Sequence, residues 1–324
     1  MVNNIDMIVI TGAAGFIGSY ITGYFNKLGY SDIMLVDDFT QSEKSLNYIY
    51  KSYKELVDRD ILFDIFKNYT IDFVFHLGAR TDTSEMDVEV LGSLNTSYTK
   101  TIWDICTKYQ IPLIYASSAA TYGNGEFGFT DDIETTLKLK PLNPYGESKH
   151  IFDLWALDQK NAPPYWVGLK FFNVFGPNEY HKGRMASVPF HLFNTLKSGN
   201  KVKIFRSHKS EYKDGHQSRD FIYVNDIAKV FEFLYNNKIE NGIYNLGSGK
   251  SRTFFDLTKA CHKSFGKDFD IDFIDIPSDI RESYQYYTQA DMSKLINAGY
   301  SKPFTSIEDG IEEYYKYLID KRSF

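Results

Sequence analysis

Short apolar runs alternate with longer amphipathic stretches over much of the chain. The apolar runs have the length and composition of buried parallel strands, and they occupy residues 7–10, 33–36, 72–77, 112–118 and 166–174. The stretches between them carry helical periodicity and include residues 16–28, 88–109 and 145–159. Strand–helix alternation implies right-handed crossovers between parallel strands. We therefore predict an α/β fold built on a doubly wound parallel sheet.

The alternating pattern stops after residue 174 and returns once, at residues 219–235, where a strand leads into a helix. Loops and shorter elements fill the rest of the second half. This change of rhythm predicts two domains. Residues 1–172 together with 219–247 form the larger one, and residues 173–218 together with 248–324 form a smaller α/β domain.

Composition narrows the class of protein. The 324 residues include 36 Lys plus Arg and 42 Asp plus Glu, a formal net charge of −6 that offers no general attraction to nucleic acid. Cys106 and Cys261 cannot build a disulfide framework, so a reducing, cytoplasmic setting is expected. We find no signal peptide, no apolar stretch long enough to span a membrane and no histidines at a metal-ligand spacing. We therefore expect a compact protein without a nucleic-acid, membrane or metal partner.

The stretch TGAAGFIG, residues 11–18, stands directly between the first predicted strand and the first predicted helix. Gly12 can adopt a backbone conformation closed to other residues, Gly15 lets a pyrophosphate approach the main chain, and Gly18 permits close helix–sheet packing. The helix N-terminus adds unpaired N–H groups and a partial positive charge. Asp37 ends the next strand about 20 residues on, as a dinucleotide fingerprint requires. The larger domain is thus predicted to be a Rossmann domain that binds a dinucleotide.

The residues after the second strand leave the choice of dinucleotide open. Asp37 would accept hydrogen bonds from the adenosine ribose hydroxyls, which favours NAD. Lys44 would instead hold a 2′-phosphate, whereas a second carboxylate at Asp38 would repel one. The sequence therefore does not separate NAD from NADP.

A tyrosine and a lysine four residues apart, Tyr145 and Lys149 in PYGESK, share one face of a predicted helix. A free tyrosine has a pKa of about 10, and a neighbouring ammonium favours the phenolate and lowers that pKa. The Y-x-x-x-K pattern also occurs at residues 50–54 and 317–321, but only the pair at 145 follows a strand that ends in serines. Those serines, Ser117 and Ser118, lie where such sheets bind ligands, and Ser118 would share a hydrogen bond with the substrate oxygen.

Several motifs of the chain resemble those of a known enzyme family. TGAAGFIG, YASSAATYG and PYGESK together resemble extended short-chain dehydrogenases/reductases that act on nucleotide sugars. More narrowly, the ADP-L-glycero-D-manno-heptose 6-epimerase family is similar in the segments SSAATYG, PLNPYGESK, FFNVFGP, HKGRMASVPFHL, SRDFIYV and YTQAD. The resemblance covers nearly the whole chain, and HKG-x-MAS is not a general feature of the superfamily. It implies an isomerase that uses NADP to interconvert two ADP-heptoses for the lipopolysaccharide inner core, as a homo-oligomer.

The chemistry of epimerisation indicates a catalytic role for Lys182. The surrounding sequence alone would instead indicate a solvated loop residue. To invert a carbinol carbon, an enzyme withdraws hydride to a nicotinamide and returns it to the opposite face. The nicotinamide is stationary, so the carbonyl must turn over, and its oxygen then lies elsewhere. The enzyme therefore needs a second proton-transfer group at this second position of the oxygen. The resemblance assigns that role to Lys182 and the first to Tyr145, with Lys149 holding the cofactor ribose.

The resemblance also implies a wider set of contacts. Beyond the glycines and acidic residues above, the cofactor is expected to contact Phe16, Ile17, Leu77, Gly78, Ala79, Arg80, Thr81, Asn95, Val174 and Lys182. The substrate-binding residues are expected to be Ser117, Asn173, Arg184, His191, Phe205, Arg206, Ser207, His208, Arg219 and Tyr284. The Arg219 guanidinium suits a diphosphate, although a surface ion pair with Asp214 or Asp220 is its plainer alternative. His191 is equally compatible with a structural role.

Three departures from the family pattern qualify the choice of sugar. Arg184 stands where the family usually has a serine that touches the substrate, Lys170 replaces an arginine, and residues 208–217 look longer than usual. A hexose 4-epimerase is the nearest rival, and it would need only the tyrosine. A 4,6-dehydratase carries an Asp-Glu pair where Ala119 and Ala120 stand, so elimination of water is not expected. A silent dinucleotide-binding sensor would be expected to lack Tyr145 or Lys149.

Overall fold

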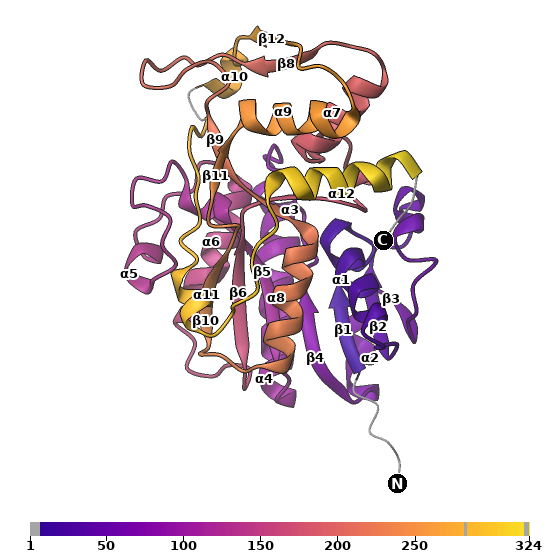
Figure 1. Ribbon diagram of the computed structural model, residues 1–324. Coiled ribbons are helices and arrows are strands. Elements are labelled where there is room, and N and C mark those ends of the chain that lie inside the picture. The colour runs from indigo at the N-terminus through magenta and orange to yellow at the C-terminus, as the bar shows by residue number, and fades with distance from the viewer. Residues whose placement is uncertain (1–6, 282–283, 321–323) are drawn as a thin grey trace.

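The computed structural model describes residues 7–281, 284–320 and 324. A seven-stranded parallel sheet forms the larger part, with strand order β10-β6-β5-β4-β1-β2-β3 (Figure 1). The strands are β1 (Met7–Thr11), β2 (Ile33–Asp37), β3 (Glu55–Asp58), β4 (Ile71–His76), β5 (Leu113–Ser118), β6 (Trp166–Phe171) and β10 (Gly242–Leu246). Most of these strands are apolar throughout, because helices cover both faces of the sheet. The predicted doubly wound α/β fold is confirmed.

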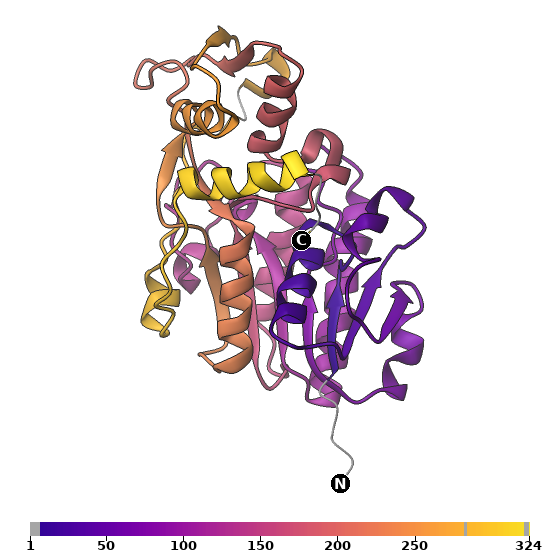
Figure 2. The ribbon, with the colours of Figure 1, turned by 45° about the vertical axis from the view of Figure 1, so that its right-hand side comes forward.

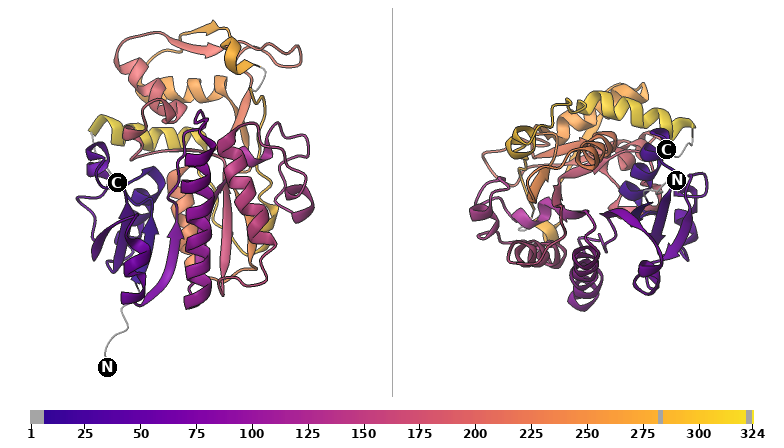
Figure 3. Two further views of the ribbon diagram at one scale, coloured as in Figure 1. Left: turned by 180° about the vertical axis from the view of Figure 1, so that it is seen from behind. Right: turned by 90° about the horizontal axis from the view of Figure 1, so that it is seen from below.

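The helices form two layers. On one face lie α1 (Phe16–Lys27) and α8 (Val224–Asn236), where the ring of Phe25 packs 5.2 Å from that of Phe75 in the sheet. The opposite face, seen in the left panel of Figure 3, is covered by α4 (Tyr98–Tyr109) and α6 (Pro144–Leu157). Asn143 caps α6 by accepting the Gly146 N–H, and Pro144 occupies its first turn. Packing against the sheet therefore anchors α1, which follows the glycine turn, and α6, which carries Tyr145 and Lys149.

Short elements connect these layers. They are η1 (Ser42–Asn47), α2 (Leu62–Ile65), η2 (Phe66–Asn68), α3 (Val88–Leu91), the π-helical segment η3 (Gly92–Ser97), η4 (Ala119–Tyr122) and α5 (Ile133–Thr136). The helix predicted over residues 88–109 is thus continuous but contains a π-helical segment. Strand β3 was not predicted from the sequence. Its pattern ELVD is short and only its valine is buried.

A smaller part sits above the carboxyl ends of the main strands (Figure 1). It contains β7 (Asn173–Phe175), β9 (Ser218–Tyr223) and β11 (Ser251–Thr253) in one sheet, and β8 (Val202–Phe205) and β12 (Ile271–Ile274) in another. Its helices are η5 (Tyr180–Met185), α7 (Val188–Lys197), α9 (Phe254–Phe265), α10 (Ser278–Arg281) and α12 (Ile307–Asp320). Helix α11 (Ser293–Asn297) lies instead beside β10 of the main sheet (Figure 1). Helix α12 crosses between the two parts (Figure 2).

Two strand predictions need correction. The run 166–174 is two strands, because the Phe172 N–H bonds to Leu246 and the chain then leaves the main sheet to pair Asn173 with Phe221 of β9. Strand β9 likewise lies in the three-stranded sheet, although α8 and β10 after it return to the main sheet. The predicted domain boundaries stay a prediction. In the part of the chain that the structure describes, the helices are all too short or too polar to cross a membrane.

Candidate active site

The glycine turn has the geometry that its sequence predicts. Gly12 has φ +68°, and a Cβ there would lie 2.7 Å from the backbone nitrogen of Gly78. A Cβ on Gly18 would lie 2.2 Å from the carbonyl oxygen of Gly12, so α1 packs against the turn at a distance only glycine permits. Gly15 precedes α1 and no side chain caps the helix. The N–H groups of the first turn are therefore free of side-chain partners and suit an anionic group.

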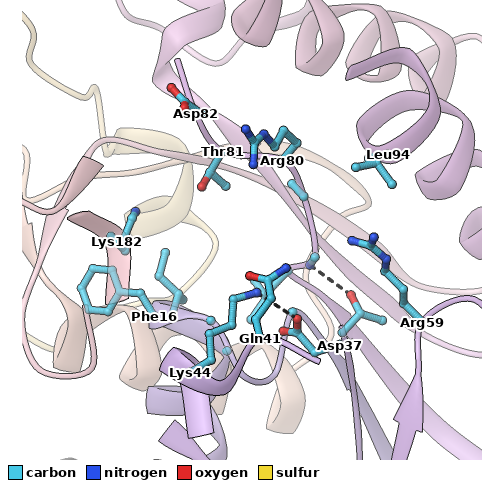
Figure 4. Close-up of a pocket in the computed structure, with 18 of the residues that line it drawn as sticks. Phe16, Asp37, Gln41, Lys44, Arg59, Arg80, Thr81, Asp82, Leu94 and Lys182 are labelled. Atoms are coloured by element: carbon cyan, nitrogen blue, oxygen red, sulfur yellow. Dashed lines mark hydrogen bonds and ion pairs between the residues drawn. The ribbon is translucent and has the colours of Figure 1, made fainter. Parts of the chain in front are cut away.

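A cavity of about 620 Å³ opens beside this turn, at the carboxyl ends of β1, β2 and β4 (Figure 4). Most residues predicted to contact the cofactor line it: Gly12, Gly15, Phe16, Ile17, Gly18, Asp37, Lys44, Leu77, Gly78, Ala79, Arg80, Thr81 and Lys182. Four do not, namely Asp38, Asn95, Lys149 and Val174. Lining residues that the sequence analysis missed are Thr11, Val36, Gln41, Arg59, Asp82, Glu85, Val90, Leu94, Tyr98, His181 and Met185. Volume and lining fit a dinucleotide.

One end of the cavity combines a carboxylate with cationic side chains. Asp37 accepts hydrogen bonds from the N–H groups of Ala14 (2.9 Å) and Asp38 (2.8 Å), and the Lys44 ammonium lies 3.3 Å away. Gln41 and Arg59 line the same end (Figure 4). Arg59 follows β3, so recognising that strand would have indicated it. At this end the carboxylate is already paired with a lysine.

Asp38 does not line the cavity, and its predicted contact with the cofactor stays a prediction. Its carboxylate accepts hydrogen bonds from the Thr40 hydroxyl and N–H and from the Gln41 side chain. These bonds hold the pKa of Asp38 at about 2, well below its usual value. The carboxylate therefore organises the turn after β2.

Lys182 lies in the cavity wall, half-buried, with its ammonium 5.7 Å from the centre of the Phe16 ring. Burial lowers the pKa of this lysine, and the charge of Glu179 opposes that effect. The neighbouring His181 has a pKa lowered to about 4 by burial and by the charges of Lys44 and Lys182, so it is neutral at pH 7. The interpretation of Lys182 as a solvated loop residue is therefore wrong.

Tyr145 is buried, at 8% exposure, near the start of α6. Burial raises the pKa of its phenol, and a hydrogen bond with Ser118 lowers it. Lys149 is also buried, which lowers its pKa to about 8, and its ammonium donates to the Ala116 carbonyl at 3.0 Å. The sequence-based expectation that Lys149 lowers the pKa of Tyr145 is thus corrected: Ser118 is the group that does so here, and burial outweighs it. Tyr145, Lys149 and Ser118 stand outside the lining of the cavity.

Asn95 connects the cavity to the helix that carries Tyr145. Its side chain accepts the Arg80 N–H (2.7 Å) and donates to the Arg80 carbonyl (3.0 Å) and to the Ser148 hydroxyl (3.0 Å). The residue is 1% exposed. Asn95 therefore positions the loop after β4 against α6 and does not itself line the cavity.

A buried ion pair lies behind the same helix. The Lys170 ammonium is 2.7 Å from the Asp153 carboxylate, and neither side chain is exposed. Asp153 also accepts hydrogen bonds from Tyr115 (3.1 Å) and Ser117 (2.7 Å). Ser117 is 3% exposed and its hydroxyl faces this pair, so its assignment to the substrate is corrected. Lys170, a departure from the family pattern, thus has a structural partner of its own.

Three of the predicted substrate residues meet in the smaller part. The buried Arg219 guanidinium lies 5.3 Å from the centre of the Tyr284 ring, and the ring of Phe205 is 5.8 Å from that of Tyr284. Arg219 donates to the carbonyls of Ser218 and Gln285, and no carboxylate in the described ranges forms an ion pair with it. The alternative of an ion pair with Asp214 or Asp220 is therefore wrong. A buried guanidinium that is paired with no carboxylate among the described residues suits an anionic ligand.

The neighbouring loop residues have structural partners. The Ser207 N–H bonds to Asp214, His208 accepts the Ile276 N–H, and Arg206 lies 3.7 Å from Asp275. These contacts hold the loop after β8 against the segment after β12.

The last predicted residues are not among those that line the cavity. Arg184 is 72% exposed and reaches the Asp82 carboxylate at 3.4 Å and the Ser84 hydroxyl, and His191 faces the Arg184 carbonyl at 3.3 Å. Asn173 is exposed and Val174 half-buried, both on β7. Arg184 therefore bridges the loops on both sides of the cavity.

Sheet, glycine turn and Tyr–Lys helix together define a dinucleotide-dependent enzyme. The model of the NAD dependent epimerase/dehydratase family matches residues 8–247. The chain belongs to this family.

Relatives narrow the comparison. The chain is 44% identical, over 98% of its length and 100% of the relative, to the ADP-L-glycero-D-manno-heptose-6-epimerase of Fusobacterium nucleatum. It is 42% identical to the protein of the same name from Nitratidesulfovibrio vulgaris, over 97% of this chain and 98% of that one. Among solved structures, the Helicobacter pylori ADP-L-glycero-D-manno-heptose-6-epimerase matches with a TM-score of 0.80 and 25% identity, covering 98% and 97% of the two chains. A UDP-N-acetylglucosamine 4-epimerase from Methanobrevibacter ruminantium matches equally well in TM-score and identity, covering 98% and 99%.

Proposed function

We propose that this protein is an ADP-heptose 6-epimerase, which converts ADP-D-glycero-D-manno-heptose to its L-glycero epimer by inverting C6″. The observation that carries the proposal is the position of Lys182. Lys182 is half-buried, and its amine lies near the Phe16 ring in the wall of the cavity beside the glycine turn. A 4-epimerase has no need of an amine there. The 44% identity to a protein named for this reaction supports the same choice of sugar.

The cavity residues fit a nicotinamide dinucleotide, and we propose NADP. The turn of Gly12, Gly15 and Gly18 would hold the pyrophosphate, since side chains at Gly12 and Gly18 would collide with the backbone that shapes this turn. Lys44 and Arg59 supply two cations at the Asp37 end, and Lys44 offsets the carboxylate there, which favours a 2′-phosphate. When bound, the cofactor supplies an acceptor and donor for one hydride.

The protein's own part in the reaction is proton transfer at two places. The C6″ hydroxyl loses its proton to one group while C6″ becomes a carbonyl carbon. After that carbonyl turns over, its oxygen receives a proton from the second group. We assign the first role to Tyr145, with Ser118 lowering its pKa, and the second to Lys182. Lys149, with its pKa near 8, holds the ribose and completes the Tyr145 site.

The substrate diphosphate is assigned to the smaller part. Arg219 offers two donor nitrogens in one plane, and the Phe205 and Tyr284 rings beside it offer faces for the adenine. Arg184 replaces a small family residue but is turned toward Asp82 and Ser84. The heptose pocket is therefore not filled by the arginine side chain. The cytoplasmic location and the self-association expected from the sequence stay predictions.

An NMR time course tests the proposal. The purified protein, without added oxidant, is incubated with ADP-D-glycero-D-manno-heptose, and the C6″ epimer is expected to appear. Lys182→Met is expected to lower turnover about 100-fold or more, because a proton-transfer group contributes on the order of 10²–10⁴ in rate. Mass spectrometry of nucleotide released from the denatured protein is expected to find NADP.

The same measurements discriminate the alternatives. An unchanged spectrum from folded, cofactor-loaded protein rejects the heptose assignment. A Lys182→Met variant that keeps full turnover with a UDP-hexose would identify a 4-epimerase. If the protein binds a dinucleotide but turns over neither sugar, it would be identified as a dinucleotide-binding sensor without catalytic activity.

A further inference from the structure

A carboxylate is buried inside the loop that carries Lys182. Glu179 is 1% exposed and lies immediately before η5. Its Oε1 accepts hydrogen bonds from the Ser187 hydroxyl at 2.5 Å and the Gly176 N–H at 3.4 Å, and its Oε2 accepts the Ser187 N–H at 2.5 Å. Gly176 follows β7 and Ser187 precedes α7. One side chain therefore joins both ends of residues 176–187 and closes them into a ring.

The backbone of the same residue holds the turn that contains Lys182. The Glu179 carbonyl accepts the Lys182 N–H at 3.0 Å. The preceding residue, Asn178, has φ +78°, and its carbonyl accepts the Asn47 side chain at 3.1 Å. The ring is thus fastened to the dinucleotide side of the molecule, and the direction of Lys182 follows from the shape of the ring.

The charges around Glu179 are few. Tyr314 of α12 and Lys182 of the loop act on the carboxylate, and His181 is next to Lys182 in the chain. Behind His181 stand Lys44 and Asp37, which neutralise each other at 3.3 Å. Burial raises the pKa of Glu179, and the Ser187 hydrogen bonds and Lys182 lower it. Glu179 in turn is the charged group that opposes the effect of burial on Lys182.

We propose that Glu179 is a positioning residue for Lys182: its carboxylate keeps residues 176–187 in the shape that directs Lys182 into the cavity. The inference rests on the proposed function, in which Lys182 transfers a proton. Glu179 is buried and accepts three hydrogen bonds, so loss of its carboxylate would leave buried donors unpaired and would favour a shift of the loop.

Three variants of the full-length, cofactor-loaded protein separate shape from charge. Glu179→Gln removes the charge and sets an NH₂ group against one of the Ser187 donors. Glu179→Asp keeps the charge but is too short to reach both ends of the ring. Tyr180→Phe is the matched control, because it changes a side chain of the same loop whose hydroxyl has no hydrogen-bond partner in the described ranges, and it leaves the bonds and charge of Glu179 intact.

Two readouts follow each variant. The first is kcat and KM with ADP-D-glycero-D-manno-heptose. The second is titration of Lys182 by NMR of [¹³C]lysine-labelled protein, with the resonance identified by its absence from Lys182→Met. Glu179→Gln is expected to lower kcat about 10- to 100-fold with little change in KM, since small misplacements of a reacting group cost that much. The pKa of Lys182 is expected to fall in Glu179→Gln and to stay unchanged in Tyr180→Phe.

A Glu179→Gln protein with native circular dichroism, wild-type kcat and an unshifted Lys182 titration overturns the inference. Should that variant not fold, Glu179→Asp decides, because wild-type kcat in Asp would refute the closed ring. If Lys182→Met itself keeps full turnover, the proposed function fails, and the titration in Glu179→Gln still tests the link between the two residues.

Discussion

Replacing Lys170 with methionine would leave a carboxylate buried without its cation. The two charged groups are 2.7 Å apart, and neither side chain is exposed. Methionine is long and unbranched, so it fills the same space while removing the charge and the hydrogen bond to Thr121. Asp153 would then keep only its hydrogen bonds from Tyr115 and Ser117.

The expected cost is large, because removing one partner of a buried pair typically costs about 3–5 kcal/mol. We expect a destabilisation near the lower end of this range. The hydroxyls of Tyr115 and Ser117 still donate to Asp153, and Lys149 lies one turn earlier on α6. In chains of this size class or somewhat smaller, each kcal/mol of lost stability lowers the melting temperature by about 2–4 °C. A loss of about 3 kcal/mol is therefore expected to lower it by roughly 6–12 °C. The double variant Asp153→Leu/Lys170→Met is expected to recover most of this loss, since it leaves no unpaired charge.

Tryptophan fluorescence during thermal unfolding is a suitable assay. Trp103 lies 5.0 Å from Trp166 and 5.8 Å from Trp155, all on the α4–α6 face where the pair is buried. The signal therefore reports on this side of the sheet. A single variant that melts within about 2 °C of the wild type, against the scale of roughly 2–4 °C per kcal/mol, would refute the reasoning. So would a double variant no more stable than the single one.

Two further predictions concern the cofactor and the tyrosine. Gly18→Ala is expected to abolish co-purification of the dinucleotide, measured by absorbance of the protein, because its Cβ would lie 2.2 Å from the backbone oxygen of Gly12; Gly92→Ala, a helical position with open space, should retain it. Ser118→Ala removes the hydrogen bond that lowers the pKa of Tyr145, so that pKa rises and less phenolate is present at a given pH. The limb of the pH–rate profile set by Tyr145 should move to higher pH, and an unmoved limb would contradict the assignment.

Local patterns in the sequence determined the frame of the molecule and much of its cavity. The alternation of apolar runs and amphipathic stretches predicted a doubly wound sheet, because burial on both faces requires apolar strands. The glycine turn and Lys182 were found for similar reasons. The turn needs glycine at fixed spacings whatever surrounds it, and Lys182 lies in a segment whose resemblance to a family extends over adjacent residues.

Only the tertiary structure decided which polar groups face one another. Asp37 and Asp38 are adjacent and chemically alike, yet one lines the cavity and the other holds a turn. Ser117 turns to a buried ion pair whose members come from α6 and β6, and Arg219 lacks the carboxylate that its neighbours in sequence offer. Periodicity and spacing are properties of a few consecutive residues. The protonation, burial and partners of a side chain depend on elements that meet only when the chain has folded, and no local pattern encodes them.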